Sequence, residues 1–355
     1  MIKYLNIKNV CMSFILLGVV VLQACNGSEE VDLPENNVEN SVFISAEIIQ
    51  APIDALLNSF FYTVSKSSSG FVLNNGGATE IAGSFIVKCV HPAADDIKVQ
   101  FELDNSLITS AYDLLPDNAG FTVDKYELTI PKGETVSNDN ITLSISSEGI
   151  NSLPIPNYYD GVTYAYMSPV IKISSASNDV KIANSAQLTT ASVAVKGSFA
   201  NNLLASGAGV LPSGAEVTTK TGWTATVGGT AYPILLDGAT GTAATAYVAI
   251  TNASLPVSLE VDMQSVQTGI TGIRLQHSAR DYHASSANVY IKETASEEYK
   301  LQGPAFSLAR PSNSSPYFHS IRFVNTVNAR YIKLEFRTSY NTSNGVRPTE
   351  FSIYK

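Results

Sequence analysis

Residues 332–337 read Ile-Lys-Leu-Glu-Phe-Arg, and this alternation of apolar and charged side chains decides the fold class. Successive side chains of a β-strand point to opposite faces of the sheet, so Ile332, Leu334 and Phe336 face a core while the charged residues face water. Residues 259–263, Leu-Glu-Val-Asp-Met, alternate in the same way. Both segments are therefore expected to be half-buried strands of a sheet.

The same alternation recurs nearer the start of the chain. Residues 97–103, Ile-Lys-Val-Gln-Phe-Glu-Leu, place their apolar side chains on one face, and residues 141–145, Ile-Thr-Leu-Ser-Ile, repeat the pattern. Between them, Pro131 and Gly133 mark a strand end and a turn, because proline fixes φ and glycine permits positive φ. Short strands at this spacing predict an antiparallel sandwich of the immunoglobulin type.

The composition of the whole chain also predicts an all-β protein. Its 355 residues are enough for about two domains, and 15% charged with 45% hydrophobic residues exclude a charge-rich disordered chain. The 17 Tyr and 14 Phe residues, with abundant Ser, Thr, Asn, Gly and Pro, favour strands joined by turns. Only residues 52–61 look briefly helical.

The balance of charges limits the partners. Lys and Arg total 22 against 31 Asp and Glu, which gives a formal net charge of −9. Nucleic acid requires a concentrated basic face, so we expect no nucleic-acid partner.

The first 24 residues have the pattern of a targeting segment. Two lysines precede the apolar residues 10–22, a stretch of signal-peptide length that is too short to span a bilayer. Residues 22–25, Leu-Gln-Ala-Cys, resemble the lipobox of bacterial lipoproteins. The resemblance implies that residues 1–24 are a lipoprotein signal peptide and that the acylated Cys25 anchors the protein to a membrane. An ordinary secretory peptide with an accidental cysteine at its cleavage site is the alternative.

Residues 25–41 are expected to form a flexible acidic tether. The segment contains no Lys or Arg, and its acidic residues are Glu29, Glu30, Asp32, Glu35 and Glu39. This acidic cluster resembles the surface-export signal of Bacteroidetes lipoproteins, which implies a position on the outer membrane at the cell surface. If the segment is a mere spacer, the protein stays on the periplasmic leaflet.

The cysteines predict no disulfide bond. Cys11 lies in the expected signal peptide and Cys25 is expected to be acylated, so Cys89 has no partner. We expect Cys89 to be a buried small hydrophobe. A fold without disulfides is stabilised by its core alone, which the size of this chain permits.

Residues 42–195 carry short motifs in the order of a known family. These are Leu-Leu-Pro at 114–116, the turn at 128–134, the strand at 141–145 and the segment 164–173. In this order they resemble the DUF1735 family of N-terminal domains on surface lipoproteins of gut Bacteroidetes. The resemblance implies a spacer in front of a glycan-binding or glycan-cleaving module. Residues 196–210, rich in Gly, Ser, Ala and Asn, are expected to be a linker.

Residues 211–355 carry a more specific set of motifs. In chain order these are Trp-Thr-Ala at 223–225, Leu-Asp-Gly at 236–238 with Thr242, Leu-Glu-Val-Asp-Met at 259–263, Gly-Ile-Arg-Leu at 272–275, Ala-Arg-Tyr-Ile-Lys-Leu at 329–334 and Glu-Phe-Ser-Ile-Tyr at 350–354. The set resembles the F5/8 type C, or discoidin-like, fold, which includes family 32 carbohydrate-binding modules. It implies a galactose-binding-like jelly roll. We therefore expect an all-β chain of two β-sandwich domains, an immunoglobulin-like sandwich followed by this jelly roll.

The same resemblance implies a structural calcium site at Asp237, Thr242 and Glu350. Calcium is bound by about six to eight oxygens, which carboxylates, a hydroxyl and loop carbonyls supply. Ala239 stands where the family often has Asp, so one carboxylate is missing. A metal-free loop in which Asp237 caps the turn is the alternative.

Two loops carry side chains suited to a sugar. Sugar recognition needs an aromatic face for C–H groups and planar groups that hydrogen-bond to hydroxyls. The first cluster is Arg274, His277, Arg280, Tyr282 and His283, and the second is Tyr340, Asn341, Asn344 and Arg347. In the resembling modules, loops at one end of the jelly roll form a shallow site, so we expect these two loops to lie side by side. Ordinary solvated loops are the alternative, and Trp223 is expected to pack against the sheet.

The sequence favours a binding protein over an enzyme. It contains no Gly-x-Ser-x-Gly, His-Glu-x-x-His, Cys-x-x-Cys or Gly-x-Gly-x-x-Gly motif. We expect a non-catalytic, cell-surface glycan-binding lipoprotein of a polysaccharide-utilisation system, with an outer-membrane importer complex and glycosidases as partners. The alternatives are an adhesin that holds a host or cell-surface protein and a cryptic glycosidase, since glycosidase carboxylates have no universal spacing.

Overall fold

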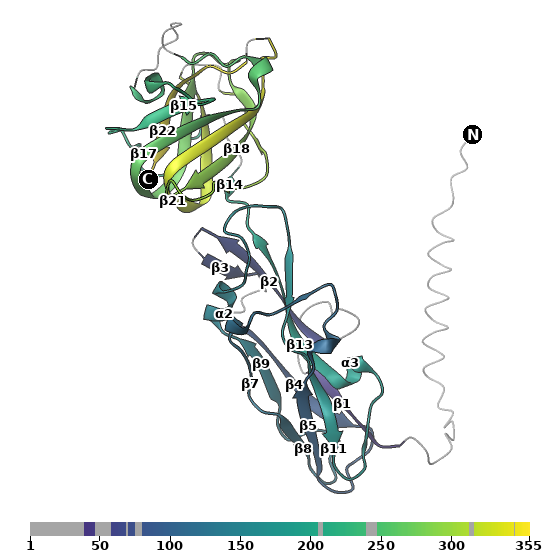
Figure 1. Cartoon of the computed structure of the whole chain (residues 1–355). Helices are drawn as coiled ribbons and strands as arrows, with labels where there is room; N and C mark the ends of the chain where they lie inside the picture. Colours follow the sequence, from purple (N-terminus) through teal and green to yellow (C-terminus); the bar gives the residue numbers. More distant parts are fainter. Residues whose placement is uncertain are drawn as a thin grey trace, which may run out of the picture. The chain divides into compact units, whose positions relative to one another are not determined.

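The computed structural model describes residues 39–46, 58–68, 70–74, 80–204, 209–238, 247–311, 316–343 and 345–355 (Figure 1). The expected signal peptide, Cys25 and most of the expected tether lie outside the described residues. The described residues form strands, short helical turns and loops, so the expected all-β class with sandwich domains is confirmed. None of the helices in this part of the chain is both long and apolar enough to cross a membrane.

Two sheets enclose the first core. One sheet has the strand order β12-β1-β4-β9-β7, with β1 at Ser41–Ala46, β4 at Ile81–Cys89, β7 at Phe121–Val123, β9 at Ile141–Ile145 and β12 at Lys181–Ile182. The other has the order β3-β2-β13-β11-β5-β8, with β2 at Asn58–Ser67, β3 at Gly70–Leu73, β5 at Ile97–Leu103, β8 at Glu127–Ile130, β11 at Ile171–Ala176 and β13 at Thr190–Phe199. Two further strands extend this second sheet, β10 at Tyr164–Met167 and β6 at Asp113–Leu114.

The first sandwich is not wholly antiparallel, which corrects one expectation. Strands β2 and β13 run parallel in unbroken register from Asn58 to Lys66, and β1 pairs in parallel with β12. A parallel pair needs a long crossover connection, and here most of the sandwich lies between β2 and β13. Residues 58–61 belong to β2, so the helix expected at 52–61 is wrong there, and residues 52–57 lie outside the described part. Phe60 and Tyr62 pack on the core at strand spacing, and this tertiary contact overrides the weak helical pattern.

The alternation seen in the sequence positions the first core. Ile97, Val99 and Phe101 of β5 are buried, as is every second residue of β9. Phe101 meets Phe85 of the facing sheet edge to face, with 5.6 Å between ring centroids. Leu103, expected on the core face, is 43% exposed, because β5 has left the core at its last residue.

Cys89 ends β4 and is buried, as expected, and no disulfide joins it to another described residue. Its thiol also donates a hydrogen bond of 2.9 Å to the carbonyl oxygen of His91. The helical elements nearby are short: α2 spans Ser147–Asn151, α3 spans Ala186–Thr189, and 3₁₀ turns span Asn105–Leu107 and Asp117–Ala119. They connect strands and contribute little to the core.

The second sandwich is built on two long strands. Its sheet has the order β16-β15-β17-β21-β18-β19, with β14, β20 and β22 paired to β21, β18 and β17. The bounds are β14 Leu203–Leu204, β15 Thr224–Val227, β16 Thr230–Ala231, β17 Val257–His277, β18 Ala284–Lys292, β19 Lys300–Leu301, β20 Phe306–Ser307, β21 Tyr317–Ser339 and β22 Pro348–Tyr354. Two 3₁₀ turns, at Pro233–Leu236 and Asn252–Ser254, lie between strands.

Strands β17 and β21 pair with each other twice. Val257–Asp262 of β17 pair with residues 331–336, the register then shifts, and residues 272–277 pair with residues 317–322. Both stretches place apolar side chains in one core, which contains Leu259 and Val261 from the first stretch and Ile273 and Leu275 from the second. The two long strands therefore contribute to both layers around this core, and Trp223 packs against it as expected.

The boundary between the sandwiches differs from the linker expected at 196–210. Strand β13 continues through Lys196 to Phe199, and Leu203–Leu204 form β14, which pairs with β21. The side chain of Asn202 is buried and donates to Gln302 over 3.1 Å. Strand residues of both sandwiches thus occupy much of the range, because its mostly small, uncharged residues fit strand edges as well as a linker. Residues 205–208 lie outside the described part.

Candidate functional site

The two loops expected to recognise a sugar lie side by side at one end of the second sandwich. Backbone hydrogen bonds join them, from Ser278 N–H to the Arg347 carbonyl over 3.0 Å and from Arg347 N–H to the Tyr282 carbonyl over 2.9 Å. Tyr340 N–H also donates to the His283 carbonyl over 3.1 Å. A third segment, residues 247–252, joins them through paired backbone bonds between Ile250 and Val346. We call the described residues of 247–252, 278–283 and 339–347 the rim.

Arg347 is held at the rim between two aromatic rings. Its guanidinium carbon lies 3.9 Å from the centre of the Tyr282 ring and 4.9 Å from that of Tyr247. A guanidinium over a ring face gains cation–π attraction, which fixes its plane and leaves the edge N–H groups to donate. Tyr247 was not expected at this site, because only the pairing of Ile250 with Val346 brings it there.

Tyr340 presents the rim's exposed aromatic ring. Its side chain is 43% exposed, and the ring stacks on His283 at 4.6 Å between centroids with 24° between planes. The hydroxyl of Tyr340 donates to the Leu308 carbonyl over 2.9 Å. With one face supported and the hydroxyl bound, the ring has a fixed position.

His277 and His283 are not at the surface, which corrects the expectation that they contact a ligand. Together with His319 they are 2%, 0% and 1% exposed and form a cluster inside the sandwich. The rings of His283 and His319 stack at 4.6 Å, and His277 meets His319 edge to face at 5.1 Å. These histidines contribute to the packing beneath Tyr340, and their side chains do not reach the surface of the rim.

Burial keeps the three histidines neutral. Desolvation lowers the pKa of His283 to about 4. The charge of Asp281 raises this pKa and that of Arg310 lowers it, each by less than desolvation does. Desolvation and the neighbouring His283 lower the pKa of His319 to about 3, and that of His277 also falls well below its usual value, chiefly through burial. A charged imidazole is costly without water or a counter-charge.

The other expected contact residues are distributed over two places. Arg280 is half-buried at the rim, next to Asp281, which forms an exposed ion pair with Arg310. Asn341 closes its own turn, since its amide oxygen accepts from Ser343 N–H over 3.1 Å. Asn344 lies outside the described residues. Arg310 was missed because nothing in its local sequence marks it.

Arg274 is not part of the rim. Its guanidinium donates to a Glu216 carboxylate oxygen over 2.8 Å and to the Tyr354 hydroxyl over 3.2 Å. It lines a separate cavity of about 340 Å³ with the two described residues of the expected calcium site, Asp237 and Glu350. The alternation of β17 explains this, because Arg274 and His277 are an odd number of residues apart and point to opposite faces.

The described residues do not fit the expected calcium site. The side chain of Glu350 is 2% exposed, and one of its oxygens pairs with the ammonium of Lys220. The other accepts Gly238 N–H over 3.0 Å. Burial raises the pKa of Glu350, while the bond to Lys220 opposes that rise. Asp237 is exposed, and Thr242 lies outside the described residues.

Lys220 is the cation beside Glu350. Its ammonium also donates to the Phe351 carbonyl over 2.6 Å and to the Ser352 hydroxyl over 3.3 Å. Within the described ranges, no group of three or more His, Cys, Asp or Glu side chains is suited to a metal ion. The carboxylate that would bind calcium is therefore already bound by N–H donors.

Comparison with known proteins gives matches to both sandwiches. A family model for a "-like, N-terminal domain" matches residues 57–179, inside the range that resembles DUF1735. A search of curated proteins gives no match.

Among solved structures, a two-domain protein of unknown function from Bacteroides fragilis is 16% identical, with 99% of this chain and 100% of that chain covered and a TM-score of 0.35. A family 32 carbohydrate-binding module from Clostridium perfringens, in complex with galactose, is 13% identical over 38% of this chain and 93% of that chain, with a TM-score of 0.28. The C-terminal domain of a chitobiase from B. fragilis is 17% identical over 39% and 96%, with a TM-score of 0.30. Since these TM-scores are below 0.5, we base the function on the geometry of the rim.

Proposed function

We propose that this chain is a non-catalytic glycan-binding protein and that the rim of the second sandwich binds the saccharide. The observation that carries the proposal is the exposed, fixed ring of Tyr340 on the same pair of loops as the stacked guanidinium of Arg347. A pyranose has an apolar C–H face and hydroxyl groups around its edge. The Tyr340 ring complements the C–H face, and the Arg347 guanidinium complements the hydroxyls.

Each side chain has a separate task in this proposal. The free face of Tyr340 stacks on the C–H face of a sugar ring, and the edge N–H groups of Arg347 donate to hydroxyl oxygens. The ring and the guanidinium are both held by neighbours, so little conformational entropy is lost on binding. A shallow site of this kind binds each saccharide weakly, and several copies on one surface raise the effective affinity.

The charges of the rim favour binding over hydrolysis. Asp281 is the rim's one carboxylate among its described residues, and it is paired with Arg310. Glycosidases generally use two carboxyl groups on either side of the scissile bond. A single paired carboxylate does not supply both an acid and a base.

The cellular setting belongs to the same proposal and comes from the sequence. The lipobox-like residues 22–25 and the acidic segment behind them support a lipid anchor on the outer membrane at the cell surface. The first sandwich then holds the rim away from the membrane. In that position the protein captures oligosaccharide for an importer complex and its partner glycosidases.

A glycan array tests the proposal. We expect the full chain to bind a defined set of glycans, and Tyr340→Ala and Arg347→Ala each to weaken that binding at least about tenfold, since each removes one principal contact. The matched controls are Tyr126→Ala, a tyrosine that is equally exposed on the first sandwich, and Arg337→Ala, an exposed arginine of β21 outside the rim.

Three results decide between the functions. Unchanged glycan binding by both rim variants shows that the rim is not the site. Binding to a host or cell-surface protein but to no glycan favours an adhesin. Release of reducing sugar from a bound glycan shows that the protein is a glycosidase.

A further inference from the structure

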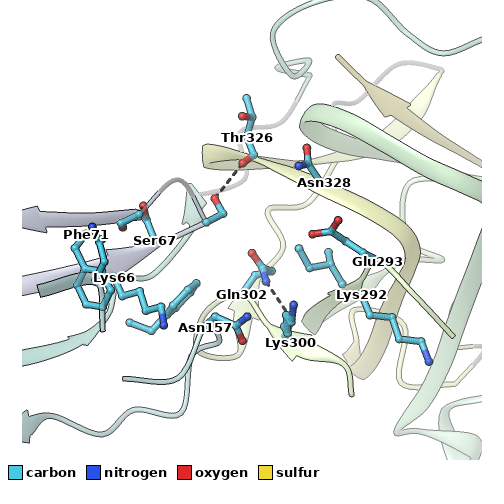
Figure 2. Close-up of a pocket in the computed structure, with 15 residues that line it drawn as sticks. Lys66, Ser67, Phe71, Asn157, Lys292, Glu293, Lys300, Gln302, Thr326 and Asn328 are labelled. Carbon is cyan, nitrogen blue, oxygen red and sulfur yellow. Dashed lines mark hydrogen bonds between the residues drawn. The ribbon is translucent and has the colours of Figure 1, made fainter. Parts of the chain in front are cut away.

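A second cavity lies far from the rim and is lined by both sandwiches. Its volume is about 360 Å³, within the range usual for ligand pockets. Figure 2 shows Lys66 and Phe71 on one wall, Glu293, Thr326 and Asn328 on the opposite wall, and Lys300 with Gln302 between them. Strand β18 begins next to the rim and ends at this cavity, so about eight residues at ~3.3 Å each put roughly 25 Å between the two places.

Hydrogen bonds tie the walls of the cavity together. The hydroxyl of Ser68 donates to the Thr326 carbonyl over 3.0 Å, and Tyr159 N–H donates to the Leu301 carbonyl over 2.8 Å. Gln302 is 1% exposed, and its amide donates to the Lys300 carbonyl over 3.0 Å. Two hydrogen bonds therefore link the segments that carry the lining residues.

Lys66 and Lys300 bring two ammonium groups to the lining of the cavity. Lys66 donates to the Ile155 carbonyl over 2.6 Å, and no described carboxylate lies within 4.0 Å of it. Lys300 forms one long ion pair, with a carboxylate oxygen of Glu297 at 3.9 Å. Burial, and secondarily the charge of Lys300, lower the pKa of Lys66, as expected of neighbouring cations. This local excess of positive charge occurs in a chain with a net charge of −9.

The third lysine of the lining is engaged elsewhere. Lys292 donates to the Ala295 carbonyl over 3.1 Å, and its ammonium lies 4.6 Å from the centre of the Tyr299 ring. Its ammonium also lies 5.0 Å from the centre of the Tyr331 ring, so Lys292 is held by two aromatic side chains. Lys66 also lies over a ring, 5.2 Å from the centre of Phe71, but that ring is itself part of the cavity lining, so Lys66 stays beside the ligand space together with Lys300.

The opposite wall indicates a ligand with more than an anionic group. Glu293 would repel a bare anion, but its carboxylate accepts hydrogen bonds from hydroxyls. Asn157 and Asn328 add amides that both donate and accept, and Phe71 and Phe199 add apolar surface. A ligand with an anion at one end and hydroxyls at the other complements both walls.

We propose that this cavity binds an acidic sugar residue, with its carboxylate or sulfate between Lys66 and Lys300 and its hydroxyls at Glu293, Asn157 and Asn328. This second site goes beyond the glycan binding proposed for the rim and does not depend on it. A glycan that carries acidic residues would then bind the molecule at two separate places.

Calorimetric titration of the full chain tests the proposal with a galacturonate trisaccharide as the probe and a neutral galactose trisaccharide as its control. We expect saturable binding of the acidic probe that weakens as salt is added, because screening reduces attraction between charges. Lys66→Met and Lys300→Met should each weaken it about tenfold, since each removes a charged hydrogen bond. Lys132→Met, which removes an exposed lysine paired with Asp95, should leave it unchanged.

Several outcomes overturn the proposal. If both lysine variants bind the acidic probe with wild-type affinity, the cavity is not the site. The unfolding midpoint of Lys300→Met shows whether that variant is folded. If Tyr340→Ala abolishes acidic-probe binding and the lysine variants keep it, the probe binds at the rim, which contradicts this proposal but not the proposed function. If inorganic sulfate displaces the trisaccharide at equal concentration, the cavity binds an anion only and the sugar is excluded.

Discussion

The ammonium of Lys220 lies among the oxygens of Glu350, Phe351 and Ser352 in the last strand, with only 7% of its side chain exposed. A sequence pattern that names Glu350 as a calcium ligand has no means of showing this, because Lys220 is distant along the chain. The two charges compensate each other inside the protein. At the scale of single residues, one distant side chain thus changes the chemistry of a whole site.

Lys220→Met should destabilise the fold by roughly 3–5 kcal/mol, because it leaves the buried Glu350 carboxylate without its partner. The measurement is the free energy of unfolding in urea, with Lys98→Met, an exposed lysine, as the control that should change little. The wild-type unfolding midpoint should be the same in calcium and in EDTA. A calcium-dependent rise of that midpoint would contradict the internal ion pair.

The buried histidines predict a dependence of stability on pH. Their pKa values are lowered in the folded protein, to about 4 for His283 and about 3 for His319, from the usual 6.5. The unfolded chain therefore binds more protons below pH 6.5, so stability is complete above that pH and falls as the pH drops towards 4, by at most about 1.4 kcal/mol per pH unit for each histidine.

Urea unfolding between about pH 5 and pH 7 measures this effect in a range where carboxylates contribute little. We expect the free energy of unfolding to change less steeply with pH in His319→Phe than in the wild type. An equally steep slope in the variant would assign the effect to other groups.

Among the rim residues, the sequence predicted Tyr282, Tyr340 and Arg347 because their chemistry is visible in their type. It did not predict that His277 and His283 would be buried, since a histidine at the end of a strand looks the same on either face. It also missed Tyr247, whose place depends on a pairing between distant segments.

At the scale of elements, the loop between β21 and β22 holds the rim in place through Gly345. This glycine has a φ of 72°, and a Cβ there would overlap the Ile250 carbonyl oxygen. Its N–H donates to the Asn341 carbonyl over 2.9 Å, which closes the turn that carries Tyr340. Both the backbone angle and the close approach require glycine.

Gly345→Ala should therefore lower stability by roughly 1–3 kcal/mol and weaken glycan binding at the rim. Gly269→Ala is a matched control, because Gly269 has the same φ of 72° but no atom near its missing Cβ. We expect the control to cost only about 1 kcal/mol and to leave binding unchanged. Equal effects of the two substitutions on unfolding and on binding would show that the contact with Ile250 is unimportant.

The strands themselves could be predicted well from alternation, because burial on one face imposes the period of two. What alternation did not show is that residues 257–277 form one strand, β17, that serves both layers. Gln264, with a φ of 65°, lies where the register begins to shift. Such a bend depends on the packing of the whole sandwich and leaves no clear periodic signal.

At the scale of the whole molecule, each sandwich has its own hydrophobic core, and residues 202–204 belong structurally to the second one. Asn202 donates to Gln302 and accepts from Asn325 N–H over 2.8 Å, and Leu203 is buried in the second core. The expected boundary at 211 therefore separates the second sandwich from part of its own edge.

A fragment of residues 201–355 should be more stable than one of residues 211–355 by roughly 2–4 kcal/mol, since the shorter fragment loses buried hydrogen bonds and one buried leucine. The corresponding difference in the thermal midpoint is about 5–10 °C. Coincident unfolding curves for the two fragments would restore the boundary at 211.

The Lys220 ammonium also bears on how the second sandwich should respond to chelators. Carboxylated polymers sequester hard divalent cations from their surroundings, because oxygen ligands are what those cations prefer. A sandwich that depended on a bound metal ion would lose stability in such a medium. The ammonium of a lysine is covalently part of the chain, so a chelator cannot remove it. If the protein binds acidic polysaccharides as proposed, the second sandwich should therefore stay folded beside ligands that withdraw calcium from solution.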